Sequence, residues 1–139
     1  MIKLDDAPWG LRIEMQGQPT RQELSKLLDD LRKALPSARP FFGVILDMSG
    51  TGLINPEVRD LLVQAQKLLQ SKGMIRMAAS LTSGLATSQF RRISSETGVG
   101  PGLRCLDSKA TGWQMVAERW AVSGHEPESA IANPASTGG

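Results

Sequence analysis

The sequence predicts a single α/β domain in which a β-hairpin is followed by alternating helices and strands. Leu11, Ile13 and Met15 alternate with polar residues, which is typical of a strand with one buried face. Residues 41–48 form a nearly continuous apolar run, which predicts a central strand buried on both faces. Leucines at helical spacing follow the hairpin and that run. The predicted order is β-β-α-β-α-β-α-β-α, with a mixed sheet that is mainly parallel after the hairpin.

The first half of the chain supplies the hairpin and one helix. Residues 2–4 and 9–15 are the predicted strands, and residues 5–8 are the turn between them. Thr20 and Glu23 have the spacing of a capping box, which predicts a helix start. The apolar stripe of this helix is Leu24, Leu27, Leu28, Leu31 and Leu35, and Pro36 is expected to end it.

A second helix is predicted to begin at Asn55, a preferred N-cap residue, with proline at the first helical position. Glu57 places negative charge at the positive end of the helix dipole. Gly73 is expected to stop the helix, and residues 74–81 read as the next strand. The predicted core stripe is Val58, Leu61, Leu62, Ala65, Leu68 and Leu69.

The last third of the chain predicts a third helix, a short strand and a closing helix. The third helix starts near Ser83 and ends at Gly98, with Leu85, Ala86, Phe90 and Ile93 turned inward. Residues 98–102 are a loop and residues 103–106 a strand. Asp107 or Ser108 is expected to cap the final helix, which carries Trp113, Val116, Ala117 and Trp120. Residues 1–121 are expected to form the domain, and residues 122–139 a disordered tail.

Composition argues against several classes of partner. The 139 residues carry a net charge of +2 with only 4% aromatic residues, so the clustered cations and stacking rings of a nucleic-acid surface are missing. No apolar stretch approaches the ~18 residues of a membrane helix, so no stable membrane insertion is expected. The N-terminus lacks a signal-peptide pattern, and we expect a cytoplasmic protein.

One histidine and one cysteine limit the chemistry. Cys105 has no partner for an internal disulfide, and its apolar neighbours predict a buried strand residue. One histidine and one cysteine cannot make a zinc site, and because His125 lies in the polar tail, a Ser-His-Asp or Cys-His arrangement would require it to fold back. We expect no enzyme, no metal site and no cofactor, although carboxylate-only chemistry stays open because burial can raise a carboxyl pKa.

Two hydroxyl-rich turns follow predicted strands. Residues 49–52 (Ser-Gly-Thr-Gly) lack the lysine of a Walker loop, so a flexible turn is favoured, with Asp47 accepting from its N–H groups. The second turn contains Ser83 and Thr87, and should lie at the same carboxyl edge of the sheet. Ser83 as a helix cap explains it, while a site for a small anion or lipid headgroup, with charge from Arg91, is the alternative.

The sequence resembles the STAS family, the sulfate-transporter and anti-sigma-factor-antagonist domain. Residues 45–73, ILDMSGTGLINPEVRDLLVQAQKLLQSKG, follow the family's pattern of a buried strand ending in Asp, a hydroxyl-glycine turn and a Leu-rich helix. The stand-alone bacterial subset called SpoIIAA-like, which is related to CRAL-TRIO lipid-transfer folds, is similar at residues 89–93 (QFRRI) and at Asp107 with Trp113. The resemblance covers residues 2 to about 120.

The chain departs from this family at the regulatory serine. In regulatory members, a serine in an Asp-Ser-Ser-Gly motif is phosphorylated by a kinase that is also the anti-sigma factor. Asn55, Pro56, Glu57 and Val58 occupy the four positions here, and Glu57, which stands in place of the acceptor serine, cannot be phosphorylated. Its permanent charge either mimics part of the phosphorylated state or only suits a helix start.

The resemblance implies a non-catalytic regulatory module that binds a protein partner, such as an anti-sigma-type kinase or another signalling protein. The expected partner-binding residues are Asp47, Ser49, Thr51, Asn55, Glu57 and Arg59. A small-ligand or lipid carrier of the CRAL-TRIO type is the alternative, with Ser83, Thr87 and Arg91 as its ligand-binding residues. Homodimerisation is left open.

Overall fold

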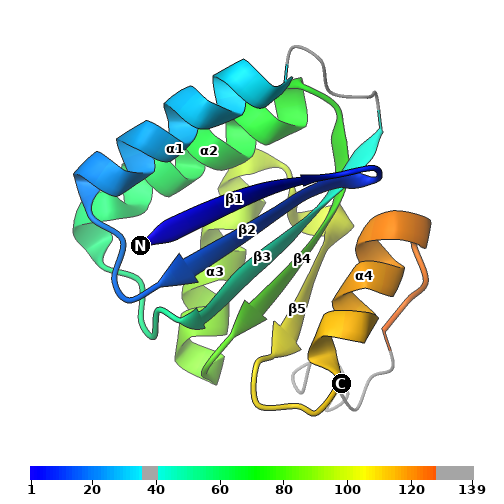
Figure 1. Ribbon diagram of the computed structural model, residues 1–139. Helices are drawn as coiled ribbons and strands as arrows, with labels where there is room; N and C mark the ends of the chain where they lie inside the picture. The colour runs from blue at the N-terminus through cyan, green and yellow to red at the C-terminus, as the bar shows by residue number, and fades with distance from the viewer. Residues whose placement is uncertain (36–40, 128–139) are drawn as a thin grey trace.

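The computed structural model describes residues 1–35 and 41–127, and in them the chain forms one five-stranded mixed sheet (Figure 1). The strands lie in sequence order, with β1 antiparallel to β2 and all later neighbours parallel. This confirms the predicted fold class. The strands are β1 (Ile2–Ala7), β2 (Gly10–Gln16), β3 (Phe42–Gly50), β4 (Met74–Leu81) and β5 (Leu103–Asp107).

Helices cover the two faces of the sheet unequally. Figure 1 shows α1 (Arg21–Ala34), α2 (Arg59–Ser71) and α3 (Gly84–Thr97) on one face, and α4 (Trp113–Ser123) alone on the other. Two short 3₁₀ helices, η2 (Pro56–Val58) and η3 (Gly100–Gly102), precede α2 and β5. None of the described helices has the length and apolar character needed to cross a bilayer.

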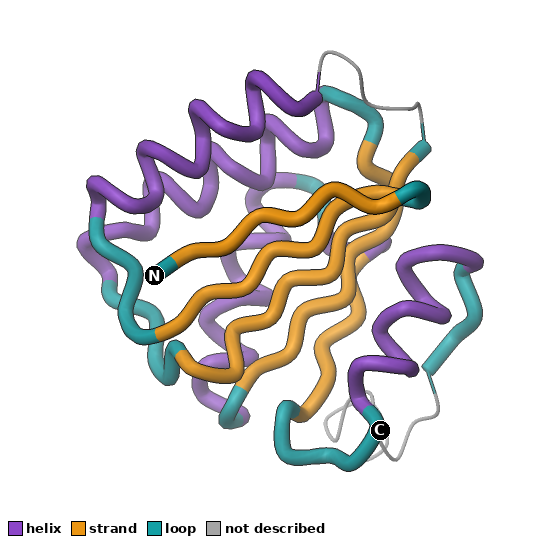
Figure 2. Tube along the Cα trace, in the orientation of Figure 1, coloured by secondary structure: helices purple, strands orange, loops and turns teal. Residues whose placement is uncertain are grey.

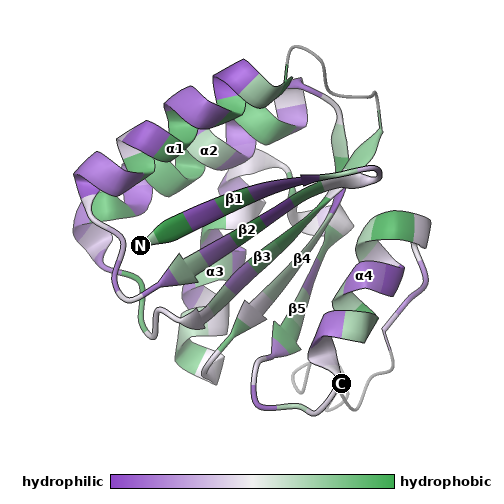
Figure 3. Ribbon diagram, viewed as in Figure 1, coloured by the Kyte–Doolittle hydropathy of each residue, from purple (hydrophilic) through white to green (hydrophobic). Residues whose placement is uncertain are grey.

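The larger core fills the space between the sheet and α1, α2 and α3. Its fully buried side chains include Phe42, Phe90, Leu24, Leu31, Met48, Leu69 and Ile93. In Figure 3 the outer face of α1 is largely hydrophilic, while β3 is largely hydrophobic. Apolar residues on both faces of β3 are thus buried, as its continuous apolar run predicted.

A smaller core holds α4 against β3, β4 and β5. Trp113 and Trp120 are both buried there, so the tryptophan pair packs in the core. The Trp120 indole N–H donates to the carbonyl oxygens of Met77 at 3.2 Å and Gly102 at 3.1 Å. A Cβ atom at Gly43 would come within 2.1 Å of the Ala121 carbonyl oxygen, so glycine at this position permits the close approach of α4.

One predicted helix start is right in position but not in helix type, and another is wrong. The helix after β3 begins as the 3₁₀ turn η2, and the α-helix starts only at Arg59. The final helix does not begin at Asp107 or Ser108 but at Trp113, behind Gly112 in the left-handed region at φ 77°. Asp107 caps a turn instead, because its side chain accepts from the Lys109 N–H at 2.9 Å.

Two apolar residues lie on the surface against expectation. Leu85, predicted to point inward, is 63% exposed in the first turn of α3. Phe41 is 76% exposed with φ 63°, and this left-handed conformation explains why the strand begins one residue later.

The ends of two predicted segments fall outside the described residues. Pro36 is one such residue, and the last residue of α1 is Ala34, with Leu35 as its C-cap. Helix α4 extends to Ser123, so it includes two residues that were assigned to the tail. Beyond it, Glu126 forms an ion pair with Arg104 of β5, and the tail from residue 128 onward is not described.

Candidate functional site

The loops that follow β2, β3 and β4 gather at one end of the sheet (Figure 2). This arrangement follows from parallel strands, whose carboxyl ends meet at a common edge. We call residues 47–57 the β3–α2 turn and residues 82–88 the β4–α3 turn. The two hydroxyl-rich turns picked out in the sequence are therefore neighbours, and each is built differently.

Asp47 organises the start of the β3–α2 turn. Its Oδ1 atom accepts from the Ser49 backbone N–H at 2.9 Å, the Ser49 hydroxyl at 2.6 Å and the Ser80 hydroxyl at 3.1 Å. Ser80 is fully buried and lies opposite Asp47 in the β3–β4 register. The prediction that Asp47 accepts from turn N–H groups is confirmed, and its carboxylate is engaged in holding the end of the strand.

Thr51 lies inside the turn. Its side chain is buried, with Oγ1 3.5 Å from the Met15 carbonyl oxygen, and its N–H donates to the Met48 carbonyl oxygen at 3.0 Å. Gly52 follows in the left-handed region at φ 72°, a conformation that glycine adopts without strain. Of the hydroxyls predicted to meet a partner, Ser49 is therefore at the surface and Thr51 is not.

Gln89 of α3 holds the middle of the turn. Its Oε1 accepts from the Ile54 N–H at 2.9 Å, and its Nε2 donates to the Ile54 carbonyl oxygen at 3.1 Å. A single amide side chain thus satisfies both backbone groups of one residue. Because the Ile54 side chain is also buried, the turn has a fixed position against α3.

Two further side chains hold the turn from the segment around the start of α1. Gln18 donates through Nε2 to the carbonyl oxygens of Thr51, at 2.6 Å, and Leu53. Arg21 donates to the Glu57 carbonyl oxygen and pairs with both carboxylate oxygens of Asp60, at 2.8 and 2.9 Å. This pairing lowers the pKa of the Asp60 carboxyl below its ordinary value.

Sequence reasoning did not assign Gln18, Arg21 or Gln89 to the site. Each reaches the turn across more than 30 positions in the chain, as the separations of 33 for Gln18 and 35 for Gln89 show. The only sequence signal was the QFRRI segment, which begins with Gln89. That segment is similar to the SpoIIAA-like subset, but the similarity assigns no role to Gln89.

The last part of the turn begins the helix. The Asn55 side chain accepts from the Glu57 N–H at 3.0 Å, so the predicted cap is confirmed, although it caps η2. Glu57 is exposed. Arg59 pairs with Glu96 of α3 at 2.6 Å, which directs its guanidinium toward α3.

Two exposed leucines flank the turn. Leu53, within it, is 48% exposed, and Leu85 of α3 is 63% exposed. Leu85 lies one helical turn before Gln89, which binds the residue next to Leu53, so both leucines lie at the carboxyl edge of the sheet. The edge thus presents apolar side chains, and the Glu57 carboxylate is exposed four residues after Leu53 in the same turn.

The β4–α3 turn uses its hydroxyls locally. Ser83 Oγ accepts from the Ala86 N–H at 3.1 Å, which confirms the predicted cap. The Thr87 hydroxyl donates to the Ser83 carbonyl oxygen at 2.8 Å. The Arg91 guanidinium instead acts on the Cys105 thiol of β5, where its positive charge partly offsets the rise in the thiol pKa that burial causes. Of the three residues of the predicted ligand site, Ser83 and Thr87 are therefore bonded to each other, whereas Arg91 is directed to β5.

Cys105 and His125 lie in different environments. Cys105 is buried, and this burial raises the pKa of its thiol. His125 is exposed beyond α4. Within residues 1–35 and 41–127, no group of three or more His, Cys, Asp and Glu side chains could hold a metal ion.

The element order, the sheet order and the turns at its carboxyl edge define an α/β domain of the SpoIIAA-like, STAS-type fold. An uncharacterized protein of the DUF3478 family from Shewanella loihica PV-4, solved with a SpoIIAA-like fold, is similar to this chain with a TM-score of 0.62. The two are 17% identical, over 87% of this chain and 92% of that one. No family model and no curated protein matches the sequence. The predicted fold resemblance is confirmed.

Proposed function

We propose that this chain is a non-catalytic STAS-like module of the bacterial cytoplasm that binds a protein partner through the β3–α2 turn. The observation that carries the proposal is the way the turn is held. Gln18, Arg21 and Gln89 fix its backbone from outside the turn, while Leu53 and Leu85 remain exposed beside it. A fixed backbone with exposed apolar residues lowers the entropic cost of binding.

Glu57 is the residue that we expect to set the regulation. Its carboxylate is exposed at the start of η2, where a partner can reach it. A carboxylate carries a permanent charge, whereas a phosphoserine carries about −1.5 to −2 only after modification. We therefore propose that binding is independent of phosphorylation at this position.

The absence of catalysis is part of the same proposal. The Asp47 carboxylate already accepts three hydrogen bonds from Ser49 and Ser80. The Cys105 thiol is buried with a raised pKa, so little reactive thiolate forms near neutral pH. These features support a binding role for the carboxyl edge over a reaction there.

Site-specific photocrosslinking in the native bacterium tests the proposal. A benzophenone amino acid replaces Leu53 or, in a second strain, Leu85, and replaces Met115 of α4 as the matched control, since Met115 is also exposed at 61%. We expect one protein to crosslink at both leucine positions and not at position 115.

The dependence on Glu57 separates a specific partner from adventitious capture. Introducing Glu57→Gln into the crosslinking strain should reduce the adduct at least about threefold, because the charge is lost while the shape is kept. Phosphatase treatment should leave the adduct unchanged. Equal crosslinking at position 115, or an adduct that requires phosphate on Ser49 or Thr51, contradicts the proposal.

The carrier alternative needs an apolar cavity beside a movable helix. A cleft of about 330 Å³ between β1 and α1 has Ile2, Leu4 and Leu27 in its lining, but Glu23, Lys26 and Asp30 line it as well, so it is not the apolar cavity that an acyl chain needs. No observation in the described residues favours a carrier over protein binding. Native mass spectrometry of the purified protein discriminates the two, since a carrier retains a lipid.

A further inference from the structure

Strand β1 forms an edge of the sheet whose outward hydrogen-bonding groups can be assigned. Met1 and Gln16 exchange both backbone hydrogen bonds, each at 2.8 Å. Because such pairs alternate along an antiparallel ladder, residues 1, 3, 5 and 7 bond to β2. The N–H and C=O groups of Ile2, Leu4 and Asp6 therefore point away from β2, where the described part of the chain provides no further strand.

The charges of β1 are complementary to those of an antiparallel copy. Lys3 and Asp5 are exposed on the same face of the strand, one on each side of Leu4. In an antiparallel pair of β1 strands centred on Leu4, each Lys3 lies opposite an Asp5. Shifting the centre to residue 3 or residue 5 places like charges opposite each other, which is unfavourable.

Helix α1 shows the same complementarity. Glu23, Lys26, Asp30 and Lys33 follow one another at helical spacing along one stripe, with alternating sign. When the helix is paired with an antiparallel copy centred on Leu28, Lys26 meets Asp30 and Glu23 meets Lys33. Each residue of the stripe then faces the opposite charge.

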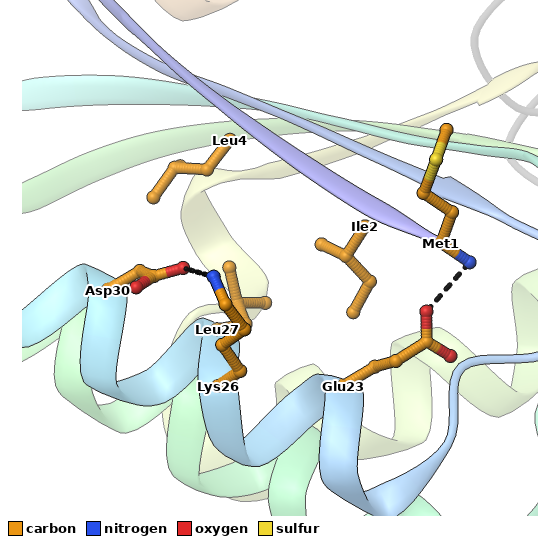
Figure 4. A pocket seen from close by; sticks show the side chains of 7 residues that line it. All are labelled: Met1, Ile2, Leu4, Glu23, Lys26, Leu27 and Asp30. Carbon is orange, nitrogen blue, oxygen red and sulfur yellow. Dashed lines mark hydrogen bonds and ion pairs between the residues drawn. The ribbon is translucent and has the colours of Figure 1, made fainter.

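The centre of the strand pair, Leu4, and the centre of the helix pair, Leu28, lie at the same level along one cleft. Ile2 and Leu4 of β1 face Leu27 of α1 across a cavity of about 330 Å³, with Lys26 and Asp30 at its rim. Figure 4 shows Leu4 above Leu27 and Asp30, near the middle of α1. In Figure 1, β1 and α1 run in the same direction, so one two-fold axis can reverse both elements.

From these observations we propose that the β1–α1 edge binds a second copy of this chain. The two β1 strands pair antiparallel about a two-fold axis at Leu4 and join two sheets into one continuous sheet. Leu4 pairs with Leu4 of the second copy, and Ile2 pairs with Asp6, through the backbone groups that point outward. The two α1 helices then lie antiparallel on the same face.

Charged residues on an edge strand usually discourage pairing with other chains. Here they allow it in one register, because only the pairing centred on Leu4 places lysine against aspartate on both sides. This makes the edge selective for its own copy. The proposal concerns the β1 edge of the sheet, which lies at the far end of the strand order from β5, and it does not depend on the proposed function of the β3–α2 turn.

Charge reversal with mixing tests the proposal. Analytical ultracentrifugation of the wild type should show a concentration-dependent mass approaching twice 15.0 kDa. Lys3→Asp and Asp5→Lys should each raise the dimer dissociation constant at least about tenfold, because each places like charges opposite each other twice. An equimolar mixture of the two variants should dimerise again, since every opposed pair is then of opposite sign.

Lys109→Asp is the matched control, because Lys109 is exposed in the loop after β5, and it should dimerise as the wild type does. Amide hydrogen exchange of the wild type should slow at Ile2, Leu4 and Asp6 as the concentration rises, a readout that needs no variant. A wild type that stays at 15.0 kDa up to ~1 mM overturns the proposal. So does a dimer that survives both reversals, a mixture that stays monomeric, or concentration-dependent protection confined to another surface.

Discussion

The β3–α2 and β4–α3 turns lie side by side at the carboxyl edge of the sheet and have similar compositions, yet they are stabilised in different ways. The β4–α3 turn is held by its own residues, since Ser83 caps α3 and Thr87 bonds back to Ser83. The β3–α2 turn is held by Gln18, Arg21 and Gln89, which come from other elements.

The way each turn is held indicates which of the two can serve as a binding surface. A turn that satisfies its own hydrogen bonds needs only to start a helix. A turn that recruits three distant side chains is held in one conformation, as a preformed site requires. Substitutions should therefore affect the two turns differently.

The largest effect is expected for Gln89→Ala. It removes both hydrogen bonds to Ile54 and leaves a partly buried N–H and C=O unpaired, which should cost about 2 kcal/mol of unfolding free energy. Urea denaturation measures the loss. Gln64→Ala is the control, because Gln64 is exposed on α2, and it should be nearly neutral. Equal stabilities of the two variants would show that the clamp has no energetic role.

A smaller effect is expected for Ser83→Ala. Loss of the cap of α3 should cost about 1 kcal/mol. Hydrogen exchange should become faster in the first turn of α3 and stay unchanged in residues 51–58. Faster exchange across both turns would show that they form one unit and would remove the contrast between them.

The smallest effect is expected from the Arg21–Asp60 pair, which is exposed. The folded pKa of Asp60 is lowered, so its contribution to stability is complete above the unfolded pKa and is lost as pH falls through the folded pKa. Asp60→Asn should therefore lower the melting temperature at ~pH 7 and make no difference at ~pH 2. The opposite pH dependence contradicts the assignment. Glu23 and Glu126 also have lowered pKa values, and they contribute to the pH dependence of stability in both the wild type and Asp60→Asn.

Local patterns predicted most of the fold. Residues 74–81 form β4 as predicted, and the capping box of Thr20 and Glu23 and the cap by Ser83 are present. These features depend on neighbours within a few positions, so the sequence carries them directly. The start of α4 was missed because Asp107 can cap a turn or a helix with the same side-chain hydrogen bond, and here Gly112 ends the turn.

The candidate site was less predictable than the fold. The sequence located the β3–α2 turn and the roles of Asp47 and Asn55, because those side chains bond within two residues. It did not show that Thr51 is buried or that Gln89 binds Ile54, because both depend on how α3 and β2 pack beside the turn. Nor did helical periodicity reveal that Leu85 lies at the exposed edge.

The hydrogen exchange rate of the Ile54 amide, measured by NMR in the wild type and in Gln89→Ala, tests most directly whether the β3–α2 turn is held in one conformation. We expect the wild-type amide to exchange at least about a hundredfold more slowly than an unstructured peptide, and most of this protection to disappear in the variant. An Ile54 amide that exchanges at the unprotected rate in the wild type would contradict a preformed binding surface.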